Sequence, residues 1–331
     1  MLLSAEHLSI NFGSRQLLDD VNFYLNEGDK VGVIGINGTG KSTFLKVLSG
    51  VTEPDGGTIS RNPNVQISLL PQNPVMDEDA TVLEQVFLHF PAEFRALNEY
   101  EAKAMLNRLG ITDFTQKVGT LSGGQRKRVA LAAALIHPAD VLILDEPTNH
   151  LDSEMVAWLE DWLRRFKGGL VMVTHDRYFL DSVCTRIWEL RGKTITTYRG
   201  NYSAYLPQRE AADERLQKQH DADVEKAAKL QDYLDRNLVR ASTTKMAQSR
   251  RRQLEKLEIT EAPQAEAHQL NFRFEYDIEP YDELVIMKGL TIRIGERTLL
   301  EALDYVVHRG DKLIIAGPNG TGKSTLLQVL D

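Results

Sequence analysis

The sequence has few of the features that mark secreted or membrane proteins. Cys184 is its one cysteine in 331 residues, which excludes an internal disulfide and cysteine-rich zinc or iron–sulfur sites. Its longest fully apolar run, Val129–Ile136, has eight residues, whereas a membrane-spanning helix needs roughly 20. The N-terminal segment MLLSAEHLSI has no cationic stretch followed by an apolar core, so we do not expect a signal peptide. These absences predict a cytoplasmic protein.

Basic residues are also fewer than acidic ones. The net charge of −8 argues against a global attraction to nucleic acid or to anionic membranes. One stretch, residues 236–254, departs from this average because it has six basic residues and no acidic one. Salt confines the field of a charge to about 10 Å, so a local basic cluster can act independently of the net charge. Its members are Arg236, Arg240, Lys245, Arg250, Arg251 and Arg252.

One glycine-rich stretch occurs twice. GINGTGKST begins at Gly35 and GPNGTGKST begins at Gly317, an offset of 317 − 35 = 282. The same offset aligns the surrounding residues without a gap, for example Leu8 with Leu290, over about forty residues. Such a match indicates a domain duplication. The second copy stops at Asp331, soon after its first helix begins, so we expect a fragment of a longer protein with two such domains.

The repeated motif has the pattern of a phosphate-binding loop. Each copy is predicted to form a strand, a loop and a helix, which is the context that makes GxxxxGK[ST] a specific signal. Gly35, Gly38 and Gly40 would let backbone N–H groups surround a β-phosphate at a helix N-terminus. Lys41 would reach the β- and γ-phosphates, and the Ser42 hydroxyl would ligate magnesium. The alternative, a glycine-rich turn with a surface lysine, is disfavoured because the motif occurs twice in the same context.

Further polar residues follow the loop in an order that favours a nucleotide-hydrolysing site. Gln72 in LLPQNP is placed to touch magnesium or an attacking water, and Ser122 in LSGGQ is a natural N-cap. Asp145 ends the run VLILD and would hold magnesium, while Glu146 is the candidate general base. His175 ends the run GLVMVTH and would contact the γ-phosphate. Taken alone, Gln72 and His175 would more often be structural, but their order after a phosphate loop favours a catalytic role.

The remaining pattern predicts an α/β fold with a mostly parallel sheet. VLILDEP (141–147) and GLVMVTHD (169–176) are continuous apolar runs, as expected of strands buried on both faces. After Tyr202, charged helical sequence is broken near RASTTK (240–245), which predicts two antiparallel helices. The expected divisions are a first domain (1–200, with a helical subdomain at about 73–135), a charged helical hairpin with a basic tip (201–262), a connecting segment (263–283) and the start of a second domain (284–331).

Together these motifs resemble those of the ATP-binding cassette ATPases, from Ala5 to about Arg199 and again from Leu284. LSGGQ with LDEPTNHLD (144–152) resembles the ABC-F class, soluble proteins with two cassettes in one chain and no membrane domain. That class comprises ribosome-associated translation factors and antibiotic-resistance proteins. The resemblance implies that ATP and magnesium are bound and that ATP is hydrolysed to ADP and phosphate. It also implies that 149–152 signal between cassettes and that Phe12 stacks on adenine, although a core phenylalanine is an equal alternative.

In this family ATP is held between the phosphate loop of one cassette and the LSGGQ helix of the other. The resemblance therefore implies that LSGGQ contacts ATP on the second loop, through Ser122, Gly123, Gly124 and Gln125. The implied nucleotide-binding residues are Phe12, Gly35, Asn37, Gly38, Thr39, Gly40, Lys41, Ser42, Thr43, Gly317, Asn319, Gly320, Thr321, Gly322, Lys323, Ser324 and Thr325. Neither composite site is complete within this chain, so we expect little or no activity from it alone.

The family's linker is a helical hairpin whose tip meets the peptidyl-transferase region and the P-site tRNA. ASTTKMAQSRRRQLEKLE (241–258) resembles the tip and the return helix of that linker. Arg240, Lys245 and Arg250–Arg252 would then contact RNA phosphates, which position a protein without reading sequence; the alternative is a solvated helix face. The short interval between Gln72 and LSGGQ predicts that the extra arm found in many members is absent or very short.

Two other function classes compete with a ribosome-bound ATPase. The ATPase subunit of a membrane transporter usually has one cassette per chain, and a basic hairpin would not join two of them. The other class comprises DNA-repair or structural ATPases and cassettes that serve mainly as binding modules. The repair types have zinc-binding cysteines or very long coiled coils, and this sequence has neither. Co-sedimentation with ribosomes or with membranes would separate the first two classes.

Overall fold

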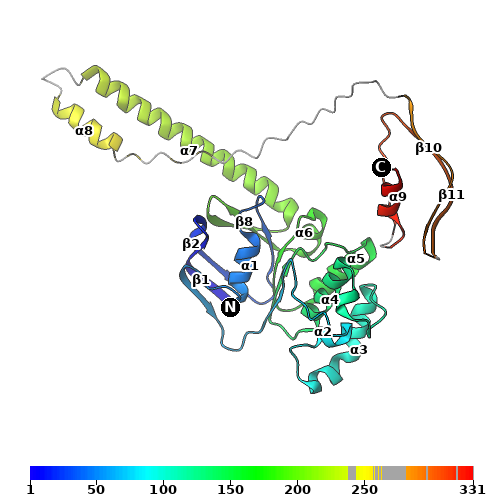
Figure 1. Ribbon diagram of the computed structural model, residues 1–331. Helices are drawn as coiled ribbons and strands as arrows, with labels where there is room; N and C mark the ends of the chain where they lie inside the picture. Colours follow the sequence, from blue (N-terminus) through cyan, green and yellow to red (C-terminus); the bar gives the residue numbers. More distant parts are fainter. Residues whose placement is uncertain are drawn as a thin grey trace.

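The computed structural model describes residues 1–237, 244–255, 257, 260, 262, 281–295, 297–317 and 320–330. The first domain contains two sheets (Figure 1). A three-stranded antiparallel sheet, in the order β2-β1-β4, is built from β1 (Leu3–Phe12), β2 (Arg15–Leu25) and β4 (Gly56–Arg61). A six-stranded sheet has the order β5-β6-β7-β3-β8-β9. Its strands are β3 (Lys30–Ile34), β5 (Ile67–Leu70), β6 (Val141–Asp145), β7 (Gly169–Val173), β8 (Arg186–Arg191) and β9 (Thr194–Arg199).

The larger sheet is parallel except at β9, which pairs antiparallel with β8. Strands β6 and β7 are buried along their whole length. Alternate residues of β6 serve two different cores: Val141 and Ile143 pack on one face of the sheet, and Leu142 and Leu144 on the other. The continuous apolar runs therefore reflect burial on both faces, and the predicted α/β fold with a mostly parallel sheet is confirmed.

Helices cover both faces of this sheet. Helix α1 (Lys41–Ser49) packs between the two sheets, where the ring of Phe44 lies 5.4 Å from that of Phe23 on β2 and 6.1 Å from that of Trp188 on β8. The opposite face is covered by α4 (Gly123–Ile136), α5 (Ser153–Arg165) and α6 (Arg177–Val183). Helices α2 (Val82–Val86) and α3 (Ala92–Arg108), with a 3₁₀ turn (Val118–Thr120), complete the helical region between β5 and β6. The central strands β6 and β7 are thereby buried between packed elements on both faces of the sheet.

A long helical hairpin follows the first domain. Helix α7 (Tyr202–Asn237) extends away from the sheets, and α8 (Thr244–Glu255) lies beside its far part (Figure 1). The Arg250 guanidinium lies 5.5 Å from the centre of the Tyr233 ring. Farther along the return, the Thr260 hydroxyl donates to the Asp223 carboxylate over 2.7 Å. These contacts confirm the predicted antiparallel pair, whose predicted tip lies largely outside the described residues.

The second copy begins with a hairpin of β10 (Glu283–Ile294) and β11 (Arg297–His308). Its pairing reproduces that of β1 and β2 at the offset of 282: Leu8 opposes Val21, and Leu290 opposes Leu303. The register shifts between the pairs of β1 and β2 also recur between β10 and β11 at the same offset. The duplication inferred from the sequence therefore extends to strand register.

One expectation for the second copy is wrong in the described structure. The segment 312–317 before the second glycine-rich loop forms no strand, and Ile314 is 92% exposed. A central parallel strand forms only when neighbouring strands supply hydrogen-bond partners for its backbone. In the first copy β3 bonds to β7 and β8, whereas no equivalent strands flank 312–317 among the described residues. Helix α9 (Lys323–Leu330) still forms, with none of its residues buried.

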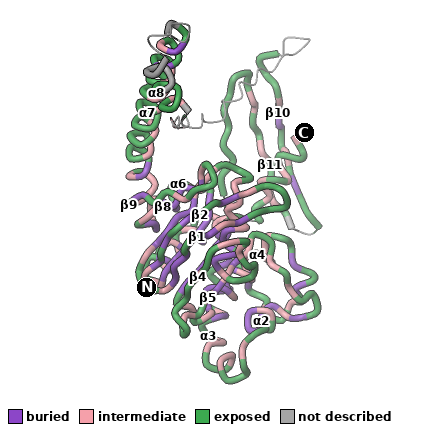
Figure 2. The backbone as a smooth tube through the Cα atoms, turned by 90° about the vertical axis from the view of Figure 1, so that its left-hand side faces the viewer, coloured by how far each residue is buried: buried purple, intermediate pink, exposed green. Residues whose placement is uncertain are grey.

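Burial separates the chain into a packed body and exposed extensions. Figure 2 shows buried residues concentrated around the two sheets, whereas α7, α8 and the β10–β11 hairpin are mostly exposed. Among the helices in the described ranges, none combines the length and the apolar character that crossing a bilayer requires.

Candidate functional site

The first glycine-rich loop connects β3 to α1 at the carboxyl edge of the larger sheet. Gly38 and Gly40 have φ angles of 81° and 90°, in the left-handed region that favours glycine. The Lys41 ammonium donates to the Gly35 carbonyl over 2.8 Å and to the Ile36 carbonyl over 3.2 Å. Its side chain is therefore folded over the concave face of the loop, where the backbone donors of a phosphate cradle converge.

The acidic residues predicted from β6 lie beside this loop. Asp145, the last residue of β6, is buried and accepts a hydrogen bond from the Ser42 hydroxyl. Glu146 has a φ of 53°, a conformation that is uncommon for a residue other than glycine and is often found at functional sites. Its carboxylate lies 3.4 Å from Nε2 of His175, whose side chain is 68% exposed. The structure thus brings Lys41 and Ser42 together with Asp145, Glu146 and His175, which lie at or just after the ends of β6 and β7.

Burial shifts the acid–base properties of this cluster. It raises the pKa values of Asp145 and Glu146 above their ordinary values, with Lys41 opposing the shift in both and His175 in Glu146. Burial also lowers the pKa of Lys41, an effect that Glu146 and Asp145 oppose. A carboxylate with a raised pKa is a stronger base than an ordinary one, which suits proton abstraction from water.

Gln72 lies in a narrow crevice with the acidic pair. The crevice is lined by Gln72, Asp145, Glu146, Asn149 and neighbouring residues. Oxygen donors of Ser42, Gln72 and Asp145 suit a hard cation such as magnesium. Among the described residues there is no cluster of three or more histidine, cysteine and acidic side chains that could hold a metal by itself.

The LSGGQ segment forms the start of α4. Ser122 is the N-cap, and its hydroxyl accepts from the Gln125 N–H over 3.3 Å while the Gln125 side chain accepts from the Ser122 N–H over 2.9 Å. This capping box satisfies two donors of the first turn. A Cβ built on Gly123 would meet no atom within 4 Å, so the surface above this residue is open to a ligand or to another domain.

The second loop repeats the local geometry of the first. The Lys323 ammonium donates to the Gly317 carbonyl over 2.6 Å, as Lys41 does to Gly35. Gly320 and Gly322 also have positive φ angles, of 79° and 95°. The described part of the loop and of α9 also includes Thr321, Ser324 and Thr325. Asn319 lies outside the described residues.

Phe12 and the three consecutive arginines of α8, Arg250–Arg252, are exposed. Phe12 is 70% exposed at the end of β1, which excludes the alternative of a core phenylalanine; its contact with adenine stays a prediction. Arg251 and Arg252 are exposed on α8, as is Arg250, which lies over Tyr233. Arg240 lies outside the described residues.

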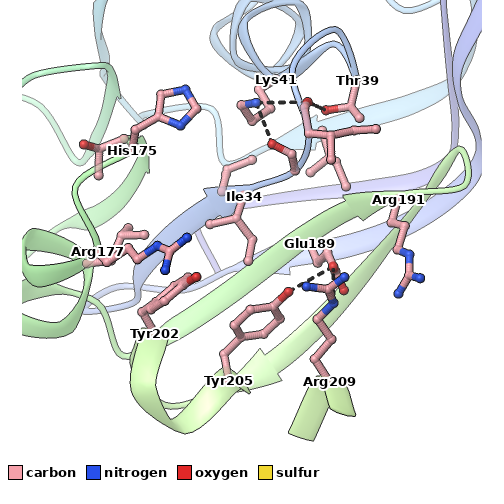
Figure 3. A pocket seen from close by; sticks show the side chains of 16 residues that line it. Ile34, Thr39, Lys41, His175, Arg177, Glu189, Arg191, Tyr202, Tyr205 and Arg209 are labelled. Atoms are coloured by element: carbon pink, nitrogen blue, oxygen red, sulfur yellow. Dashed lines mark hydrogen bonds and ion pairs between the residues drawn. The ribbon is translucent and has the colours of Figure 1, made fainter. Parts of the chain in front are cut away.

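A second group of residues lies next to the loop, and it was not identified from the sequence. A cavity of about 410 Å³ extends from Gly35, Lys41 and His175 to the first turns of α7 (Figure 3). At that end, the buried Glu189 of β8 accepts a hydrogen bond from the Tyr205 hydroxyl over 2.9 Å and pairs with Arg209 over 3.2 Å. The available signal was a glutamate inside the otherwise apolar run IWEL.

Comparisons with known proteins identify the family. The family model described as "ABC transporter" matches residues 18–149, and a second model with the same description matches 188–274. The chain is 36% identical to the "Putative ATP-binding protein YdiF" of Bacillus subtilis (strain 168), over all of this chain and 58% of that protein. It is 32% identical to the "Probable ATP-binding protein YbiT" of Escherichia coli O157:H7, over 99% of this chain and 69% of that protein.

Solved structures support the fold. A protein described as "Structure of ATP binding subunit of ABC transporter" matches with a TM-score of 0.55 and 24% identity, over 60% of this chain and 90% of its own. The "Dimeric Structure of MJ0796, a Bacterial ABC Transporter Cassette" matches with a TM-score of 0.53, also at 24% identity, over 60% of this chain and 98% of its own. On the evidence of its sequence relatives and of this shared fold, the chain belongs to the ATP-binding cassette family.

Proposed function

We propose that this chain is the greater part of a cytoplasmic ATPase whose two cassettes close around ATP and thereby position the α7–α8 hairpin on ribosomal RNA. The chain spans 58% of YdiF, so the activity belongs to the longer protein. The observation that carries the proposal is the direct attachment of a helical hairpin with a basic return helix, α8, to a cassette whose phosphate loop lies beside Asp145, Glu146 and His175. The proposed contact lies near the peptidyl-transferase centre and the P-site tRNA, in a translation factor or a protein that protects ribosomes from antibiotics.

The chemistry follows from the residues around the first loop. Lys41 would exchange its bonds to the Gly35 and Ile36 carbonyls for bonds to the β- and γ-phosphates. Ser42, Gln72 and Asp145 would hold magnesium, which when bound neutralises charge on the phosphate oxygens. Glu146, with its raised pKa, would accept the proton of the attacking water.

His175 and the LSGGQ turn would each contribute to one of the two composite sites. His175 is exposed beside Glu146, so its ring can reach the γ-phosphate while it orients the Glu146 carboxylate. The open surface at Gly123 and the N-terminus of α4 favour a phosphate carried by the other cassette, because helix N-termini attract anions. ATP would then be the ligand that joins the two domains.

The hairpin supplies the proposed RNA contact. In the described part of α8, the basic residues precede the acidic Glu255 at the helix end. Three consecutive helical residues spread over about 200° around the axis, so Arg250, Arg251 and Arg252 cannot all face one partner. Since Arg250 lies over Tyr233, we expect Arg252 to contribute more to RNA binding, together with Lys245 nearer the turn.

The ATPase subunit of a transporter is the second candidate, because several relatives are named as ABC transporter ATP-binding proteins. Co-sedimentation of the full-length protein with purified ribosomes and with membrane vesicles, with and without Mg–ATP, separates the two. We expect ATP-dependent association with ribosomes. Association with vesicles alone would favour the transporter assignment.

Replacement of Arg250, Arg251 and Arg252 by Glu tests the hairpin directly. ATP binding should be unchanged, ribosome association should weaken sharply, and each lost phosphate contact should reduce the log–log salt slope by about 0.7–0.9. The matched control replaces Lys218, Lys226 and Lys229 of α7 by Glu, an equal change in charge on a helix face that also contains acidic residues. Equal ribosome affinity and an equal salt slope for the arginine variant and the parent would refute the contact.

A further inference from the structure

The cavity beside the phosphate loop has the first two turns of α7 as one wall (Figure 3). Glu189 lies opposite Ile34 in the register of β8 and β3, so it is level with the residue immediately before Gly35. A Cβ on Gly35 would stand 2.7 Å from the Leu190 carbonyl. The phosphate loop therefore begins in close contact with the strand segment that contains Glu189.

Glu189 is also the anchor of α7. Its carboxylate is buried and accepts hydrogen bonds from Tyr205 of α7, at 2.9 Å, and from Tyr198 of β9, at 3.2 Å. Arg209, one turn farther along α7, pairs with the same carboxylate and with Asp213, which in turn pairs with Arg191 over 2.6 Å. A buried carboxylate is costly unless it is paired and hydrogen-bonded, so Glu189 fixes the position of its partners on α7.

A second connection begins at His175. Two residues later α6 begins with Arg177, whose guanidinium lies 5.6 Å from the centre of the Tyr202 ring at the start of α7. From the last turn of α6, the Asp181 carboxylate accepts hydrogen bonds from the N–H (2.6 Å) and the hydroxyl of Ser203. The N-terminus of α7 is therefore tied to the helix that follows the γ-phosphate-sensing position.

We propose that Glu189, Tyr205 and Arg209 are positioning residues that couple the nucleotide state of the first cassette to the direction of α7. The proposal rests on the proposed function, in which ATP positions the hairpin, and it names the residues that transmit the effect. Movement of the phosphate loop or of His175 when ATP binds shifts β8 and α6, and the two connections carry that shift into the first turns of α7. Because α7 has 36 residues with a rise of about 1.5 Å each, a small rotation at its root moves its far end by several ångströms.

A distance measurement between two spin labels tests this coupling in the chain itself. One label is placed at Glu53→Cys on the cassette and the other at Gln217→Cys on α7, both at exposed positions. Cys184 is buried, and burial raises its thiol pKa, so a chain with Cys184 alone should take up no label. In the parent, saturating Mg–ATP should shift the distance distribution.

Tyr205→Phe should abolish or broaden that shift while changing the dissociation constant for ATP by less than about threefold. Tyr198→Phe is the matched control, because it removes the same group from the same carboxylate but lies on β9 within the cassette, and it should keep the parental shift. The double variant Glu189→Gln with Arg209→Met removes the charge pair without leaving a buried charge unpaired, and it should lose the shift as well.

Three outcomes would overturn the coupling. These are an unchanged shift in both Tyr205→Phe and the Glu189→Gln, Arg209→Met double variant, an equal loss in Tyr198→Phe, or no shift in a parent that binds ATP. Ribosome co-sedimentation of the full-length protein is a separate readout, so loss of RNA association with an intact ATP-dependent shift would refute the proposed function and leave the coupling standing.

Discussion

The Lys41 side chain provides the sharpest test of the nucleotide site. Its ammonium group donates to the Gly35 and Ile36 carbonyls, so ATP binding would exchange two bonds to neutral carbonyls for bonds to charged phosphates. A hydrogen bond to a charged group contributes about 1.5–3 kcal/mol. Because each 1.4 kcal/mol is a factor of ten, Lys41→Ala should weaken Mg–ATP binding by about 12- to 150-fold.

Calorimetric titration at constant ionic strength measures this loss. The Lys323→Ala background isolates the first loop, because Lys323 occupies the same position in the second. Lys46→Ala is the matched control: it removes the same charge from an exposed position of the same helix, α1. The control should bind ATP with an affinity close to that of the background. An affinity of Lys41→Ala within about threefold of the background would refute the assignment of Lys41 to the phosphates.

Three further predictions concern the residues around the loop. In the full-length protein, Glu146→Gln should retain ATP binding but slow hydrolysis by about 10²-fold or more, and a parental single-turnover rate would exclude Glu146 as the base. Because the pKa of Asp145 is raised by burial, its ionised form costs stability above that pKa, and the cost vanishes as pH falls below the ordinary value. Asp145→Asn should therefore raise the Tm of the nucleotide-free chain at pH 7 and have a diminishing effect toward pH 4, as scanning calorimetry would show. Gly32→Val should lower stability by about 1–3 kcal/mol, measured by urea unfolding, because a Cβ there would lie 2.7 Å from Leu180.

The position of a site residue could be predicted from the sequence where it follows from the strand that precedes the residue. Asp145 and His175 each follow an apolar run, and the carboxyl ends of parallel strands meet at one edge of a sheet, so their proximity could be predicted. The register of the second hairpin could also be inferred, because each residue pair of β1 and β2 has a counterpart 282 residues later in β10 and β11.

Two features could not be read from local patterns. The segment 312–317 has the composition of a buried strand, but composition reports only that burial is tolerated, while strand formation depends on partners that lie elsewhere. Glu189 is a single charged residue in an apolar strand, and its partner Tyr205 is 16 residues away on a helix whose angle to the sheet no local pattern specifies. Both depend on contacts that only the assembled fold defines.

The strand order would allow one loop to serve both the proposed catalysis and the proposed movement. In the sequence β6-β7-β3-β8, the carboxyl end of β3 with its phosphate loop lies between the ends of β6 and β7 on one side and β8 on the other. The first pair supplies Asp145, Glu146 and His175, and β8 supplies Glu189. In the proposed function, a displacement of the loop by a phosphate would therefore reach the proposed hydrolytic residues and the anchor of α7 at the same time. A sheet in which β8 lay at a distance from β3 would separate these two functions.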